Sequence, residues 1–147
     1  MKIQATTGYA LRILQYIHEQ GNRTITGTEM AEKLDISYLY MMKLLGKMKA
    51  AGFIRSLQGC NGGYRMAKTA EKITVFEVYA AIEGTLHLYD PQADVRCNNR
   101  EAAIKEYFDG VEDMIVLSMR RTTIRDLFDR HVKGKKMPKR NLRRIAE

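Results

Sequence analysis

Two amphipathic helical patterns separated by a turn of only three residues are the feature that most constrains this chain. Thr26 with Glu29 three residues later forms a capping-box pattern, which predicts the start of a short helix. Ser37, at the end of the turn Asp35-Ile36-Ser37, is placed to cap a second helix that stops at Gly52. Apolar residues of this second helix recur at i, i+3, i+4 and i+7, which predicts one buried stripe: Met41, Leu44, Leu45 and Met48. Two helices joined by so tight a turn predict a helix-turn-helix.

A glycine-rich stretch follows the second helix. The β-prone runs FIRSL and YRMA flank the segment GCNGG, which predicts a hairpin and makes the helix-turn-helix winged. No Gly-Lys-Ser/Thr phosphate loop is present, so this segment is not a nucleotide-binding loop. Cys60 falls at the expected tip, either as a small turn residue or as a thiol whose modification would weaken DNA binding.

The rest of the chain is helical by its periodicity and capping signals. We expect helices over residues 7–20, from Thr74 to Gly84, over 99–121, and from Thr123 to about residue 131. The predicted fold is mainly α with a small β-hairpin wing: a winged helix-turn-helix domain plus a long dimerisation helix. The predicted divisions are a DNA-binding domain at 1–84, a sensor loop at 85–98, dimerisation helices at 99–132, and a basic flexible tail at 133–147.

Charge is distributed unevenly along the 147 residues, whose formal net charge is +8. Residues 1–72 hold eleven Lys or Arg and five Asp or Glu, residues 73–132 hold seven and eleven, and residues 133–147 hold seven and one. A basic front and tail around an acidic middle favour a polyanion-binding module joined to another function. Neither a membrane span nor an export signal is found, so we expect a cytoplasmic protein with free thiols and no membrane partner.

The candidate DNA-binding residues lie on two elements. On the second helix, the face opposite the buried stripe can enter a major groove and holds Tyr38, Leu39, Met42, Lys43 and Lys47, with Gly46 allowing close approach of the backbone. On the wing, the candidates are Arg55, Gln58, Asn61 and Arg65. An exposed helix face without a partner would not be expected to carry Tyr38, Leu39 and Met42 together.

These segments resemble the Rrf2 (Rrf-two) family of bacterial winged helix-turn-helix transcription regulators, which includes IscR-like and NsrR-like proteins. The motifs that carry the resemblance are TTGYALRIL, EMAEKLDIS, YLYMMKLLGKMKAAGFI, GCNGGYRMA and ITVFEVYAAIEG. The resemblance implies a homodimer, paired through the long helix, that binds a palindrome on double-stranded DNA, most often as a repressor. The long-helix stripe also needs a partner on its own account, and the expected interface residues are Ile104, Tyr107, Phe108, Val111, Met114 and Ile115.

The chain departs from the family where many members hold an iron–sulfur cluster. Those members carry three closely spaced cysteines before the long helix, whereas this chain has Cys97 alone, with His87 as a possible assistant. We therefore expect no cofactor and regard Cys97 and His87 as candidate sensor residues, for a thiol switch or for a small-molecule or protein effector. Met42 and Gln58 stand where the family often has an acidic residue and an arginine, so the target sequence should differ.

Two other classes of function compete with a DNA-binding regulator. An enzyme is not supported, because His18, His87 and His131 lie far apart in sequence and no catalytic triad or metal set is present. A winged-helix adaptor that binds protein or RNA remains an alternative without a specific DNA target.

Overall fold

The helix-turn-helix forms as the sequence predicts. In the computed structural model, which describes residues 4–89 and 99–132, helix α2 covers Gly27–Leu34 and helix α3 covers Tyr38–Ala50. The Ser37 hydroxyl accepts a hydrogen bond from the N–H of Tyr40, and Asp35 adopts the left-handed φ of 53° that turns the chain between the helices. All four residues of the predicted α3 stripe are fully buried: Met41, Leu44, Leu45 and Met48.

The capping box expected at Thr26 is only half formed. The Thr26 hydroxyl accepts from the N–H of Glu29 at 3.1 Å, as predicted. The Glu29 carboxylate does not return to the backbone of Thr26; it accepts from the Tyr16 hydroxyl at 2.9 Å and from the Arg23 guanidinium at 3.0 Å. A charged guanidinium is a stronger donor than a backbone N–H, so the carboxylate turns toward it.

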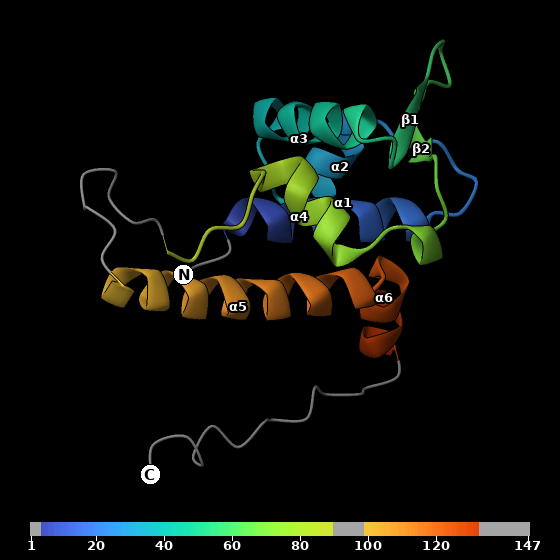
Figure 1. The fold of residues 1–147 in the computed structure, drawn as a ribbon. Helices are drawn as coiled ribbons and strands as arrows, with labels where there is room; N and C mark the ends of the chain where they lie inside the picture. The colour runs from blue at the N-terminus through green and yellow to red at the C-terminus, as the bar shows by residue number, and fades with distance from the viewer. Residues whose placement is uncertain (1–3, 90–98, 133–147) are drawn as a thin grey trace.

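Two further helices complete the layer under α3. Helix α1, Ala5–Glu19, begins two residues earlier than predicted and buries one face in the core. Helix α4, Val75–Glu83, starts at a complete capping box between Thr74 and Glu77. Both α1 and α3 contact α4, and Figure 1 shows α4 between α3 and the long helix.

The wing is an antiparallel hairpin of β1, Ile54–Leu57, and β2, Gly63–Met66. It projects from the end of α3, as Figure 1 shows. A third segment joins it, since the N–H of Ile25 donates to the Tyr64 carbonyl at 3.1 Å and the N–H of Tyr64 donates back at 2.7 Å. A short 3-10 helix, η1, Ala70–Lys72, then leads the chain to α4. The pairing with Ile25 fixes the start of β2, next to the tip of the wing, beside the start of α2.

Of the last two helices, the first has an exposed apolar face and the second packs into the core. Helix α5, Asn99–Arg121, has the predicted bounds and runs along the molecule below α4 (Figure 1). Helix α6, Ile124–Val132, was grouped with α5 in the expected dimerisation region, but Ile124 and Phe128 are buried in the same core as the winged domain. The main chain is also joined there, because the N–H of Ile124 donates to Ile73 and the N–H of Val75 donates to Thr122. None of the described helices is long and apolar enough to cross a membrane.

Candidate nucleic-acid interface

The N-terminal half of α3 presents an uncovered face. Because Met41, Leu44 and Leu45 face the core, residues on the opposite side of the helix point outward. Tyr38 is 51% exposed and Leu39 is 83% exposed. Lys43 is also exposed and makes no hydrogen bond or ion pair with any described residue. Two large exposed side chains and a free ammonium group therefore lie on the outward side of α3.

Two of the predicted α3 residues contact neighbouring helices; Met42 is half-buried and Lys47 is exposed. The Met42 thioether packs against Gly27 of α2, where it is half-buried at the edge of the core. The Lys47 ammonium donates to the main-chain carbonyl of Ile82 in α4 at 2.9 Å. Both residues lie on the predicted face of the helix, but their side-chain ends turn toward neighbouring helices.

The predicted wing residues lie partly at the tip of the hairpin and partly in its strands. Gln58, Cys60 and Asn61 form the exposed tip. Arg55 and Arg65 are directly opposite each other in the strand register, and the Arg65 Nε donates to the Thr24 hydroxyl at 2.8 Å. Two cations facing each other across a hairpin repel, so an anion between or beside them would stabilise the wing.

A groove separates the wing from the start of α2. Its volume is about 680 Å³, and its lining includes Arg23, Thr24, Gln58, Asn61 and Arg65. This groove brings three of the four predicted wing residues together beside the N-terminus of α2, where a helix favours negative charge.

Arg23 is the residue of this groove that was not predicted from the sequence. Its guanidinium is held by Gln20 and Glu29, and Glu29 also accepts from Tyr16. The hydrogen bonds from Arg23 and then Tyr16 lower the pKa of the Glu29 carboxyl, so the carboxylate stays charged and keeps Arg23 in place. The sequence signal that could have identified Arg23 is its position as a basic residue in the turn just before the Thr26 cap.

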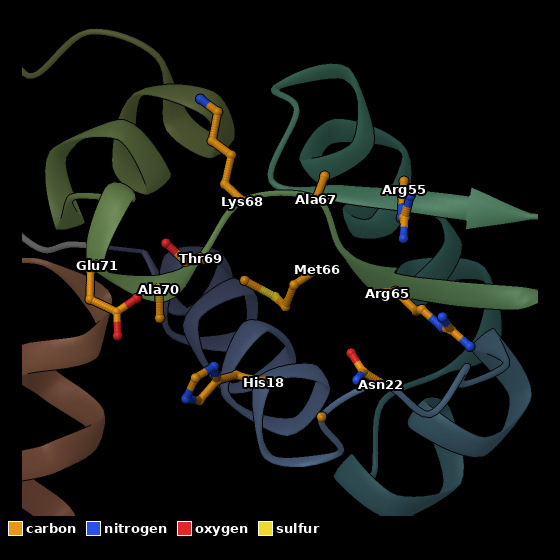
Figure 2. A pocket seen from close by; sticks show the side chains of 11 residues that line it. His18, Asn22, Arg55, Arg65, Met66, Ala67, Lys68, Thr69, Ala70 and Glu71 are labelled. Atoms are coloured by element: carbon orange, nitrogen blue, oxygen red, sulfur yellow. The ribbon is translucent and has the colours of Figure 1, made fainter.

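A second cleft lies on the α1 side of the hairpin, with a volume of about 440 Å³. Figure 2 shows Arg55, Arg65 and Lys68 around it, with their charged ends pointing in different directions. At its far end the Glu71 carboxylate pairs with Arg125 of α6 at 3.3 Å. The cations are spread along the hairpin and do not converge on one point, an arrangement suited to a polyanion surface.

Of the two predicted sensor residues, only His87 is among those that the structure describes. His87 is exposed on the connection after α4, and Cys97 lies outside the described residues, as does the basic tail 133–147. The described start of the connection is held on α5: Leu86 is buried, the N–H of Leu88 donates to Glu112 at 3.3 Å, and Tyr89 stacks on Phe108 with centroids 5.3 Å apart.

The predicted interface stripe of α5 is uncovered in the single chain. Tyr107 is 68% exposed and Met114 is 71% exposed, and Ile104 is exposed beside them. Leu117, which was not among the predicted interface residues, extends the same exposed apolar surface. The other three predicted residues are half-buried along its edge: Phe108, Val111 and Ile115.

Comparisons with known proteins agree with this geometry. The family model described as "Rrf2: Iron-dependent Transcriptional regulator" matches residues 3–130. The HTH-type transcriptional regulator IscR of Cereibacter sphaeroides is 25% identical over 134 residues, which is 86% of each chain. Protein aau3 of Rhizobium meliloti is 32% identical over 83 residues, which is 56% of this chain, and the match spans only about half (54%) of aau3. The structure of CymR, the global cysteine regulator of B. subtilis, superposes with a TM-score of 0.73 at 22% identity, over 88% of this chain and 97% of CymR.

The iron in that family description makes the donor set of this chain relevant. Among the described residues, no three His, Cys, Asp or Glu side chains come together in a way that could hold a metal ion. Cys60 lies at the exposed wing tip, so Cys97 is the single thiol before the long helix. Iron–sulfur clusters are held by four Cys, or by two Cys with two His. A single chain supplies one such thiol, too few to complete either set by itself.

Proposed function

The chain belongs to the Rrf2 family of transcriptional regulators, and we propose that it acts as a homodimeric repressor on a palindromic DNA site. As a member of this family it is a DNA-binding regulator and not an enzyme. The repressor role, the dimer and the palindrome are the proposed parts. Such a repressor works where the bacterial chromosome is, in the cytoplasm.

The exposed face of α3 is the observation that carries the proposal. Leu39, at 83% exposure, and Tyr38, at 51%, stand uncovered at the N-terminal end of the second helix of a helix-turn-helix. In this motif the N-terminal residues of the recognition helix contact base edges in the major groove. Apolar side chains there can contact thymine methyl groups, and Lys43 can reach a phosphate or a guanine.

The wing groove supports a second contact with the DNA backbone. Arg23, Arg65 and Asn61 line it, and the Glu29–Arg23 pair keeps one cation fixed at its edge. Contacts of this kind set the register of a protein on the duplex without reading its sequence. Arg55 and Gln58 extend the same basic surface along the hairpin.

The uncovered stripe of α5 supports the dimer. Large exposed apolar residues along one face of a 23-residue helix favour a partner of the same kind, and twofold pairing is the commonest solution. Two recognition helices would then meet half-sites about 34–36 Å apart on the duplex. An effector that binds near residues 85–98, where His87 and Cys97 are the candidate sensors, would act where this connection is held on α5.

Selection of binding sites from a pool of random duplexes tests this function. After several rounds of capture on the purified protein, sequencing should show two inverted half-sites with centres about 10–10.5 base pairs apart. A captured pool that stays random would contradict the specific-regulator proposal and would favour a winged-helix adaptor.

A further inference from the structure

Two helix ends meet near the C-terminus of α4, and neither carries a capping charge of its own. The last turn of α4 carries no basic residue. The first turn of α1 carries no acidic residue, and its N-cap, Gln4, makes no side-chain cap. A helix C-terminus favours a cation and a helix N-terminus favours an anion, so both ends are open to charges from other elements.

Glu83 of α4 supplies the missing anion to α1. Its carboxylate accepts from the Thr7 hydroxyl and from the N–H of Gln4 at 3.4 Å. Thr7 is itself buried, at 2% exposure, so its hydroxyl depends on this partner. The end of α4 is therefore joined to the start of α1.

Lys47 of α3 supplies the missing cation to α4. Its ammonium donates at 2.9 Å to the carbonyl of Ile82, one of the last four of that helix, which lack an intrahelical donor. Lys43, Lys47 and Glu83 line the same small hollow of about 220 Å³, where the Glu83 carboxylate attracts both ammonium groups, but only Lys47 also bonds a carbonyl of α4. Extending the Lys47 side chain away from α4 toward a phosphate would break this bond and leave the negative end of α4 uncompensated.

We propose that Lys47 is a positioning residue, which fixes the recognition helix α3 on the end of α4 and does not serve as a phosphate ligand. The inference rests on the proposed DNA-binding function and concerns how that site is held. Lys43, one turn earlier on α3, has a free ammonium group and is the phosphate contact of this pair. The connection after Gly84 starts at this same junction, so a displacement of the end of α4 would reach α3 through the Lys47–Ile82 bond.

Matched lysine variants test the assignment through the salt dependence of DNA binding. Each phosphate contact adds about 0.9 to the slope of log affinity against log salt concentration. Lys43→Met should lower the slope by about that amount and weaken binding to all sequences alike. Lys47→Met should leave the slope unchanged, weaken binding to the selected site about tenfold, and have little effect on unrelated DNA. Lys47→Arg, which keeps a charged donor, should restore most of the lost affinity.

Amide hydrogen exchange of the free protein tests, without DNA, whether the Lys47–Ile82 bond holds α3 on α4. Lys47→Met should speed exchange in residues 44–50 of α3 and 80–84 of α4, whereas Lys43→Met should leave both segments unchanged. Unchanged exchange in Lys47→Met, or a slope lowered by about 0.9 in that variant, would overturn the proposal. If the wild-type protein bound no DNA specifically, the proposed function would fail. The exchange experiment would still show whether Lys47 holds α3 on the end of α4.

Discussion

At the scale of single residues, Gly63 decides whether the wing can pair with the rest of the domain. Its φ is +145°, and a Cβ added there would lie 2.5 Å from the carbonyl oxygen of Ile25, the residue that pairs with Tyr64. Any other residue would strain its own backbone and push the third segment away from the hairpin.

Gly63→Ala should therefore destabilise the protein by about 1–3 kcal/mol or more, measured by urea unfolding. Gly46→Ala is the matched control, because Gly46 lies in α3 with nothing within 4 Å of an added Cβ. The control should gain up to about 1 kcal/mol from its better helix propensity. Equal effects of the two substitutions would contradict the role assigned to Gly63.

Sequence patterns predict which face of a helix a residue occupies, but not where its side chain ends. Periodicity placed Met42 and Lys47 on the face opposite the buried stripe, and their positions on α3 agree. The end of Met42 packs on Gly27, and that of Lys47 reaches Ile82, thirty-five residues later in the chain. These choices depend on neighbouring helices, which a single-helix pattern does not contain. Arg23 was missed for the same reason, since its partners come from α1 and α2.

At the scale of elements, two reciprocal caps hold α4 and α6 at their N-termini. Thr74 and Glu77 exchange hydrogen bonds at the start of α4, and Thr123 and Asp126 do so at the start of α6. Hydrogen bonding from the N-cap backbone lowers the pKa of both carboxyls, Glu77 from 4.5 and Asp126 from 3.8. Because the folded-state pKa is the lower one, each cap contributes stability above the ordinary pKa and loses it as pH falls through the folded value.

Glu77→Gln should show this pH dependence directly. The variant should be less stable than the wild type near neutral pH, and the difference should shrink as pH falls below 4.5, the ordinary value of this carboxyl. Glu32→Gln, at an exposed position of α2, is the control and should change stability little at either pH. Urea unfolding at a series of pH values measures both. A stability difference that grows on acidification would contradict a lowered pKa for Glu77 in the folded protein.

Local rules account for most of the elements and fail where tertiary contacts compete. Capping signals, helical periodicity and the glycine-rich turn predicted the bounds of the helices and the hairpin to within a few residues. The half-formed box at Thr26 is the exception, because Arg23 competes for the Glu29 carboxylate. The docking of α6 is another: the cap at Thr123 predicted a helix there, but not that Ile124 and Phe128 are buried where it packs on η1 and α1.

At the scale of the whole molecule, the exposed apolar stripe of α5 is the surface through which we propose that two chains pair. Met114→Lys places a charge in the middle of the exposed stripe and should convert the proposed dimer to a monomer in sedimentation velocity. Asp109→Lys is the matched control. It introduces the same residue on α5 outside the predicted stripe; it loses a surface pair with Lys105 worth about 0.3–0.5 kcal/mol and adds a like-charge pair that costs a similar amount. If Met114→Lys sedimented like the wild type, the stripe would not be the interface.

The overall organisation was predictable, and the effector was not. Helix order, the tight turn and the hairpin indicate a winged helix-turn-helix, and the family match agrees. The candidate sensor Cys97 lies outside the described residues, so the thiol and effector hypotheses stay predictions.

The central claim is that the N-terminal face of α3 reads DNA sequence, and the affinity of a Leu39→Ala variant tests it most directly. Leu39 is exposed in the single chain, so the substitution leaves the fold intact. By fluorescence anisotropy at fixed salt, the wild type should bind its selected palindrome at least about a thousandfold more tightly than an unrelated duplex. Leu39→Ala should lose about tenfold or more on the palindrome, as expected for one lost base contact of about 1–3 kcal/mol, and almost nothing on the unrelated duplex. Equal losses on both duplexes, or no loss on either, would contradict the account.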